Sequence, residues 1–235
     1  MIKVIQPGLF TTIQDAGRHG FRNIGIPTSG FMDQESAWAA NELVKNNKDE
    51  SLLEVTLTGP TLIFNCNCVI SITGGDFNPL INNLPVKMYQ SINVRTGDIL
   101  KLNNTINGAR SYIAISGGLN VKSLFGSKSF FSNISDSYHL KKGDEIKVSK
   151  KSESQILKLD KLKFNLNRFM KVFRGPEYDL LSTNSKKKLF KNEFTINTNN
   201  RMAYNLEETL QVDIKTIISS PVLPGSVQLL SLIHI

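Results

Sequence analysis

Short segments rich in β-branched residues or in alternating apolar residues dominate this sequence. Gly, Asn, Asp and Pro residues, which favour turns, separate these segments. The segments are residues 51–59, 61–75, 92–102 and 111–118. Thr-Gly-Asp at 96–98 and Lys-Gly-Asp at 142–144 adjoin apolar strands in the manner of barrel turns. The pattern therefore predicts a mainly β chain.

One segment, residues 35–44, has the pattern of a helix, which makes the predicted fold α+β. The Asp33 carboxylate can cap its start, and the polar pair at 46–47 marks its end. The face that this helix would bury consists of Ala37, Ala40, Asn41 and Val44.

The length of 235 residues is enough for one large domain or two small ones. Residues 150–167 are polar and rich in lysine, as in a linker or a sheet edge, and a strand-and-turn pattern resumes after them. We therefore expect two β-rich domains, at residues 1–150 and 151–235.

The net charge of +8 alone does not indicate a nucleic-acid-binding protein. It results from 28 Lys and Arg against 20 Asp and Glu, but the lysines are mostly scattered and no nucleic-acid motif accompanies them. The sequence also lacks an apolar run long enough to cross a membrane and an apolar signal segment. We expect a cytoplasmic protein with no nucleic-acid or membrane partner.

Several motifs of well-known sites are absent. The sequence contains no phosphate-binding loop, no dinucleotide-binding G-x-G-x-x-G after a strand and no G-x-S-x-G nucleophile turn. The three histidines are isolated, and Cys66 and Cys68 are expected to lie on one strand without further ligands. No metal site is predicted.

The segment from Gln14 to Gly30 holds five glycines or prolines in seventeen residues, so its backbone must turn repeatedly. Polar side chains on such a loop, including Gln14 and Ser29, can converge on a ligand. The guanidinium of Arg18 can grip a carboxylate, and Asp15 could orient Arg18 or act as a base. Alternatively, the acidic residues only cap turns.

A second glycine-rich stretch follows the strand that ends near residue 116. The backbone N–H groups of Gly117 and Gly118 could approach an oxyanion or an amide closely, and Ser127 could donate a hydrogen bond there. Such a pair of glycines can equally form an ordinary turn.

The segment from Gln14 to Asp33 resembles a family signature, QDxGRxGxxxxGxPxSGxMD. The family contains the C subunit of 5-oxoprolinase, allophanate hydrolase subunit 2 and the biotin-dependent carboxyltransferase region of urea amidolyase. Further blocks resemble it at residues 53–60, 72–76, 112–118, 126–127, 174–177, 200–206 and 220–228.

The sequence departs from the family pattern at three places. Lys128 and Phe130 stand where the family has Arg and Thr, and Ala203 and Asn205 replace a glycine and an arginine. Residues 229–235 do not continue the family sequence, so we expect the second domain to be incomplete at its C-terminal end.

The resemblance implies two cyclophilin-like β-barrel domains. It also implies a role in the ATP-dependent opening of 5-oxo-L-proline to L-glutamate, as a C subunit that works with the B and A subunits, which are KipI-like and LamB/YcsF-like proteins. ATP would act through the complex. The residues implied to act are Asp15 and Arg18 in catalysis and Gln14, Ser29, Gly117, Gly118, Ser127 and Arg201 in substrate binding.

Two alternative functions stay open within the family. The first is transfer of CO₂ from carboxybiotin to urea or a related amide, with the biotin on a separate carrier because this chain has no carrier lysine motif. The second is a non-catalytic regulator that binds a KipI-like kinase inhibitor.

Overall fold

The computed structural model of the chain describes residues 1–149, 157–160, 171–201, 203–210, 222–223 and 225–228. Contacts divide the chain into two compact units, Met1–Phe164 and Asn165–Ile235. Residues 157–159 belong with the first unit because Leu157 and Leu159 make backbone hydrogen bonds with Ser91 and Tyr89.

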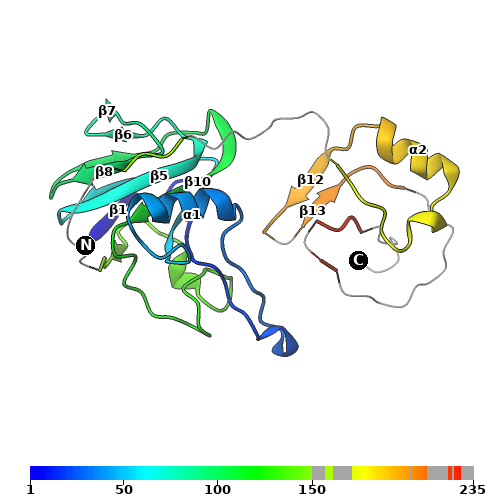
Figure 1. The fold of residues 1–235 in the computed structure, drawn as a ribbon, viewed down its shortest axis with the longest axis horizontal. Helices are drawn as coiled ribbons and strands as arrows, with labels where there is room; N and C mark the ends of the chain where they lie inside the picture. Colours follow the sequence, from blue (N-terminus) through cyan, green and yellow to red (C-terminus); the bar gives the residue numbers. More distant parts are fainter. Residues whose placement is uncertain (150–156, 161–170, 202, 211–221, 224, 229–235) are drawn as a thin grey trace. The chain divides into compact units, whose positions relative to one another are not determined.

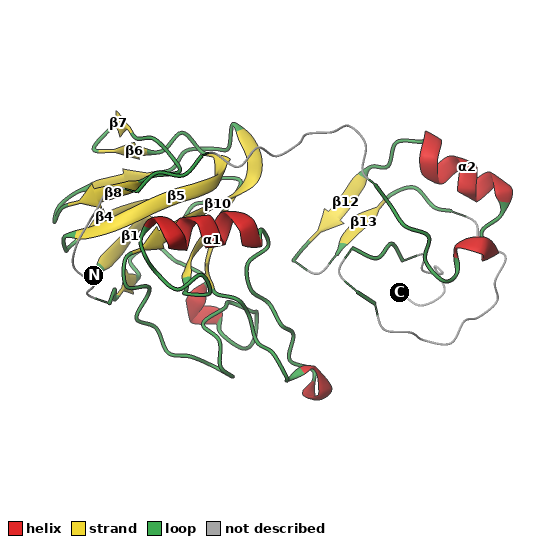
Figure 2. Ribbon diagram, viewed as in Figure 1, coloured by secondary structure: helices red, strands yellow, loops and turns green. Residues whose placement is uncertain are grey.

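Two antiparallel sheets form the first unit (Figures 1 and 2). The six-stranded sheet has the order β11-β1-β4-β9-β6-β7. Its strands are β1 (Ile2–Gln6), β4 (Thr61–Phe64), β6 (Leu80–Ile81), β7 (Leu84–Pro85), β9 (Ile99–Lys101) and β11 (Glu145–Ile146). The five-stranded sheet has the order β2-β3-β10-β5-β8. Its strands are β2 (Phe10–Gln14), β3 (Leu52–Thr56), β5 (Cys68–Asp76), β8 (Ser91–Val94) and β10 (Asn107–Ile115).

The five-stranded sheet is the middle of three layers. Along β10, Ile113 and Ile115 join the core between the sheets, while Tyr112 and Ala114 face the helix α1 (Gln34–Leu43). This alternation follows from the two-residue period of a strand. The mainly β prediction is confirmed, and the pairing of the described strands runs through separate sheets without closing into a barrel.

Helix α1 lies across β5 and β10, as Figure 1 shows. Asp33 caps it by accepting hydrogen bonds from the backbone N–H and the hydroxyl of Ser36. The four residues predicted for the buried face, Ala37, Ala40, Asn41 and Val44, are all buried. Ser71 and Thr73 of β5 donate to helix carbonyls, each at 2.6 Å, which the small alanines permit by allowing a close approach. Both helix predictions are confirmed.

The prediction that Cys66 and Cys68 share one strand is wrong. β4 ends at Phe64 and β5 begins at Cys68, and the two strands belong to different sheets. The three residues between them form the crossing, where Asn67 accepts a hydrogen bond from the backbone N–H of Thr96. Two asparagines at the crossing favour a turn over a continuous strand.

The second unit contains α2 (Thr183–Lys191) and the hairpin of β12 (Ile196–Asn199) and β13 (Tyr204–Leu206). The described residues of the two units also form three short 3-10 helices: η1 (Arg22–Ile24), η2 (Asp136–Tyr138) and η3 (Tyr178–Leu180). The expected linker at 150–167 falls largely outside the described residues, and the divergent tail at 229–235 falls wholly outside them.

Candidate functional site

The glycine-rich loop after β2 and the segment 123–129 meet at Asp15. The Asp15 carboxylate accepts hydrogen bonds from the hydroxyls of Ser127 and Ser129, each at 2.6 Å. It also accepts from the backbone N–H of Lys128 at 2.5 Å and of Gly17 at 2.8 Å. Asp15 therefore joins two segments that lie more than a hundred residues apart in the chain.

Arg18 lies beneath this junction and is only 1% exposed. Its Nη2 donates to the Ser129 carbonyl and to the Ser135 hydroxyl, whereas Nε and Nη1 are buried without a partner in the described structure. Burial lowers the pKa of Arg18, and the nearby Asp15 charge opposes that shift. We call Asp15, Arg18, Ser127, Ser129 and Ser135 the anchoring cluster.

Burial of Arg18 corrects its expected role. A guanidinium without exposed surface cannot grip a substrate carboxylate from the loop surface, so the geometry assigns Arg18 to holding the segment 129–135. Ser127 is likewise buried, and its hydroxyl donates to Asp15.

Gln14 and Ser29 lie on the same loop and also bind within the protein. Gln14 is buried, and its Nε2 donates to the Thr12 hydroxyl at 3.0 Å. The hydroxyl of Ser29 donates to the Phe130 carbonyl at 2.5 Å. Both side chains make internal hydrogen bonds that help to shape the loop.

Gly117 and Gly118 differ from the expected oxyanion site. The Gly117 N–H donates to Asn46 Oδ1 at 2.8 Å and the Gly118 N–H to the Ile115 carbonyl at 2.9 Å, so both donors are already used. Gly118 has another role: with φ at +77°, an added Cβ would lie 2.5 Å from the Glu50 Cγ and Cδ atoms. The glycine makes room for the Glu50 side chain.

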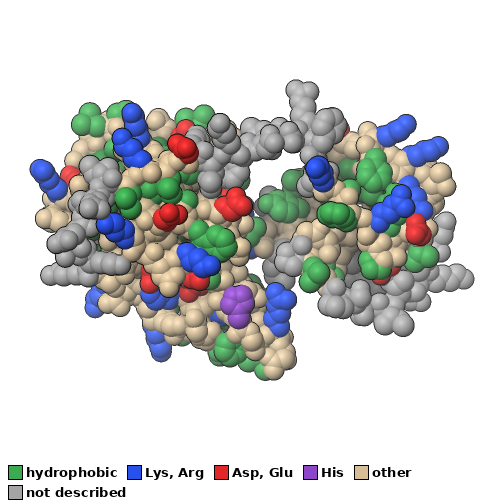
Figure 3. All heavy atoms as spheres, viewed as in Figure 1, with side chains coloured by type: hydrophobic (Ala, Val, Ile, Leu, Met, Phe, Trp, Pro, Cys, Tyr) green, Lys and Arg blue, Asp and Glu red, His purple; other side chains and the backbone are tan. Residues whose placement is uncertain are grey.

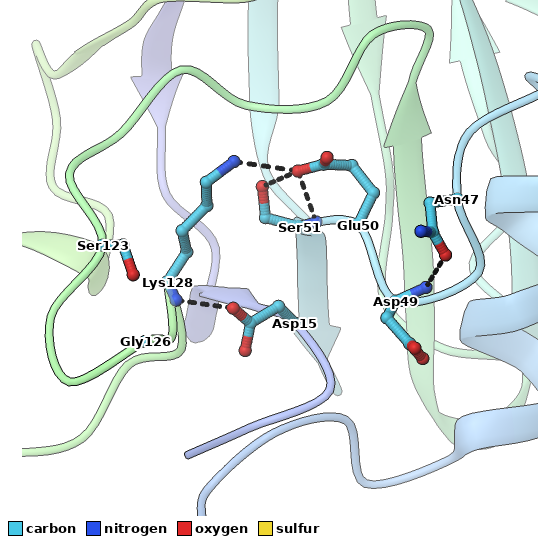
Figure 4. Close-up of a pocket in the computed structure, with 8 residues that line it drawn as sticks. All are labelled: Asp15, Asn47, Asp49, Glu50, Ser51, Ser123, Gly126 and Lys128. Atoms are coloured by element: carbon cyan, nitrogen blue, oxygen red, sulfur yellow. Dashed lines mark hydrogen bonds and ion pairs between the residues drawn. The ribbon is translucent and has the colours of Figure 1, made fainter. Parts of the chain in front are cut away.

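A pocket of about 210 Å³ opens between the loop after α1 and the segment 123–128 (Figure 4). Its lining residues are Asp15, Asn47, Asp49, Glu50, Ser51, Ser123, Gly126 and Lys128. Within it, Lys128 Nζ lies 2.9 Å from Glu50 Oε1 and donates to the Leu119 carbonyl at 3.0 Å. We call these two residues the Lys128–Glu50 pair.

Two asparagines position the Glu50 end of the pair. Asn41 of α1 donates to the carbonyls of Lys48 and Glu50, and Asn46 donates to Asn41 and to the Ile115 carbonyl. The loop after α1 is thereby tied to the end of β10. Glu50 consequently projects into the pocket from a rigid frame, and its side chain is 28% exposed.

The electrostatics of Glu50 favour its charged form. Burial raises the pKa of Glu50, but hydrogen bonds from Lys128 and from the N–H and hydroxyl of Ser51 outweigh burial and leave that pKa below its ordinary value. All three donors bind Oε1. In the described part of the chain, Glu50 Oε2 has no hydrogen-bond partner.

The pocket does not fit ATP. Three carboxylates against one ammonium give its lining a formal charge of −2, which repels a triphosphate, and its volume is small for a nucleotide. Among the described residues, no three His, Cys, Asp or Glu side chains are grouped to hold a metal ion, and no helix is long and apolar enough to span a membrane.

Arg201 lies in the turn between β12 and β13 of the second unit and is partly buried. The other seven predicted residues all belong to the first unit, where Asp15 lines the pocket and Gln14, Arg18, Ser29 and Ser127 surround Asp15. Gly117 and Gly118 flank the Glu50 side of the pocket.

Sequence reasoning missed Glu50 and treated Lys128 only as a departure from a family pattern. A usable signal was present: the polar run 46–51 directly follows a capped helix, and Lys128 follows a glycine turn. On the face of the first unit that Figure 3 shows, Lys and Arg side chains are scattered among side chains of other kinds.

The chain is similar to proteins of two kinds. It is 28% identical to the C subunit of 5-oxoprolinase from Escherichia coli over 235 residues, which covers 97% of this chain and 76% of that protein. It is 39% identical to urea amidolyase of Saccharomyces cerevisiae over 131 residues, which covers 55% of this chain. The chain spans only 7% of the length of that urea amidolyase.

Solved structures show the same fold. In the crystal structure of TTHA0988, the match covers 97% of this chain and 46% of the TTHA0988 chain, with a TM-score of 0.78 and 26% sequence identity. In the crystal structure of Kluyveromyces lactis urea amidolyase, the match covers 87% of this chain and 14% of the urea amidolyase chain, with a TM-score of 0.72 and 30% sequence identity. The family model described as carboxyltransferase domain, subdomain A and B, matches residues 24–231, and the chain belongs to this family.

Proposed function

We propose that this chain acts as the C subunit of a 5-oxoprolinase, helping a complex convert 5-oxo-L-proline to L-glutamate with ATP. The observation that carries the proposal is the extent of similarity. The match to the 5-oxoprolinase C subunit covers nearly all of this chain and three quarters of that protein, whereas urea amidolyase contains the matched region as a small part.

The pocket beside Asp15 is the place where the chain would contact the substrate. Its volume of about 210 Å³ suits a single small ring, and its polar wall provides an ammonium and a carboxylate next to each other. Because the pocket does not fit ATP, the nucleotide would bind on the partner A and B subunits. The anchoring cluster would hold the pocket wall at residues 127–129 in place.

Reconstitution tests this function. The chain, purified with the A and B subunits from the same source, should release L-glutamate from 5-oxo-L-proline with ATP hydrolysis, measured by an L-glutamate assay. Omission of this chain should reduce turnover at least 100-fold. Glutamate release that is equal with and without this chain would overturn the proposal.

The second candidate is carboxyl transfer from a carboxybiotin carrier to urea or a related amide. The higher identity to urea amidolyase, 39% over 131 residues, favours it. The two functions differ in their requirements: carboxyl transfer needs a biotinylated partner, so avidin would inhibit it. The 5-oxoprolinase reaction would be insensitive to avidin.

A further inference from the structure

The glycine-rich loop extends away from the two sheets and carries the 3-10 helix η1 near its far end (Figures 1 and 2). Apolar side chains are exposed there. Ile24 is 62% exposed, and the Phe21 ring meets the ring of Phe125 edge-on, with the centroids 5.4 Å apart. Phe125 belongs to the segment 123–129 and is 46% exposed. We call Phe21, Ile24 and Phe125 the apolar tip, and Figure 3 shows hydrophobic side chains on the surface at this end of the first unit.

The backbone holds Phe125 in a conformation that does not suit it. Leu124 and Ser127 exchange backbone hydrogen bonds of 2.8 and 3.1 Å, so Phe125 and Gly126 are the central residues of a two-residue turn. Their φ angles, +52° and +75°, are both positive, as in a type I′ turn, which favours Asn-Gly. A bulky aromatic residue is strained in this left-handed region. The turn therefore keeps an exposed ring where folding alone would favour asparagine, and such strain indicates a role in binding.

The charges on the two segments that form the apolar tip are all positive. Residues 16–32 and 121–135 contain no Asp or Glu. Arg22 and Lys122 are exposed on these segments, and so is His19. The surface that complements the tip is therefore an apolar groove with acidic residues at its rim.

We propose that the apolar tip is the docking site for a partner subunit, whose apolar groove takes the rings of Phe21 and Phe125 and whose acidic rim faces Arg22. The partner is the A or the B subunit of the complex, and in this respect the inference rests on the proposed function. Aromatic residues and arginine are enriched at protein interfaces. The turn also places the Phe125 ring before binding, which lowers the entropy lost on association.

Calorimetric titration of the full chain with each purified partner subunit tests the site. Phe125→Asn removes the ring and installs the residue that the turn prefers, so the affinity for the docking subunit should fall at least tenfold. The Tm of the chain should fall by no more than about 2 °C, because relief of the strain offsets the lost contact with Phe21. Arg22→Glu should also weaken binding at least tenfold, and salt raised to about 0.5 M should weaken wild-type binding.

Leu57→Asn is the matched control. Leu57 is 45% exposed and also left-handed, with φ at +58°, but it lies elsewhere on the unit. It follows the end of β3 that pairs with Phe10, whereas the glycine-rich loop starts at Gln14, beside the other end of β3. Leu57→Asn should leave the affinity for the subunit unchanged. Wild-type affinity in Phe125→Asn, or an equal loss in Leu57→Asn, overturns the site.

Other occupants of the apolar tip give different results, and each overturns the proposal. A Tm that falls by more than about 5 °C in Phe125→Asn means that the chain itself buries the ring. If Phe125→Asn abolishes only self-association in sedimentation, a second copy covers the tip. If it abolishes only binding to phosphatidylserine vesicles, a membrane surface does.

The test separates the docking site from the activity of the complex. A subunit that binds through the apolar tip, in a complex that does not open 5-oxo-L-proline, supports the site and overturns only the 5-oxoprolinase role. Complexes with Phe125→Asn that assemble and turn over as wild type overturn the site and leave that role intact. If neither subunit binds the wild-type chain, both fail.

Discussion

Two polar clusters meet around the segment 123–129, and they differ in how their groups are paired. In the anchoring cluster, Asp15 receives four hydrogen bonds, and the serine hydroxyls around it are buried. In the Lys128–Glu50 pair, the side chains are 27% and 28% exposed and each keeps hydrogen-bonding capacity. Saturated groups stabilise a fold, whereas unsaturated groups beside a pocket can bind a ligand.

The largest loss of stability is expected for Asp15→Ala. It leaves two serine hydroxyls, two backbone N–H groups and the buried Arg18 without their anion. Because unsatisfied buried donors and an uncompensated buried charge are costly, the free energy of unfolding should fall by about 3 kcal/mol. Guanidinium denaturation of the purified chain measures it. Asp15→Asn, which keeps one acceptor oxygen, should lose less, and an unchanged Asp15→Ala midpoint would refute the anchoring role.

Lys128→Met should reduce activity strongly and stability only slightly, the reverse of the effect expected for Asp15→Ala. The ion pair with Glu50 is partly exposed, so its loss should cost less than about 1 kcal/mol of stability. Loss of the ammonium that lines the proposed substrate pocket should lower kcat/KM of the reconstituted complex about 100-fold. The check is denaturation and glutamate release measured on the same preparation, with Lys128→Arg expected to retain part of the activity. A loss of stability large enough to explain the loss of activity would mean that Lys128 anchors the fold, as the anchoring cluster does.

Arg18→Met tests whether charge or shape matters in the anchoring cluster. Arg18 makes hydrogen bonds through Nη2 alone, and its other nitrogens are buried without partners in the described structure. The cost of burying these groups offsets the bonds that are made, so an apolar side chain of similar length should change stability by at most about 1 kcal/mol. The same denaturation experiment measures the change. A loss as large as that of Asp15→Ala would show that Arg18 is fully paired in solution.

Much of the fold could be predicted from the sequence because local patterns carry it. The apolar and β-branched residues of β3 and β10, the Asp33 cap and the turn at 96–98 all depend on residues close together in the chain. The split between β4 and β5 was missed because the apolar run 61–72 continues on both sides of a short crossing. Sequence alone could not show that this crossing changes sheets.

The candidate site was predicted only in part, for a physical reason. The glycine loop drew attention to Asp15, which lines the pocket, and its expected catalytic role stays a prediction. Burial decides whether a polar side chain anchors or binds, and burial is a tertiary property. Arg18 and Ser127 are buried inside the protein. Glu50 contacts Lys128, which lies 78 residues further along the chain, and local sequence patterns do not reveal such a contact. Gly118 was noticed for its N–H, and its actual contribution is the space it leaves for Glu50.

The smallest effect concerns the pH dependence of the Lys128–Glu50 pair. The pKa of Glu50 lies below its ordinary value of 4.5 in the folded chain, because Lys128 and Ser51 outweigh burial. Glu50 therefore contributes stability that is present above about pH 4.5 and is lost as the pH falls through the lower, folded pKa. Glu50→Gln lacks this contribution, so the difference in Tm between wild type and variant should shrink on acidification from neutral pH. A difference that stays constant below pH 4.5 would mean that the carboxylate gains nothing from Lys128. The exposed position of the pair keeps the effect modest, and salt should weaken it further.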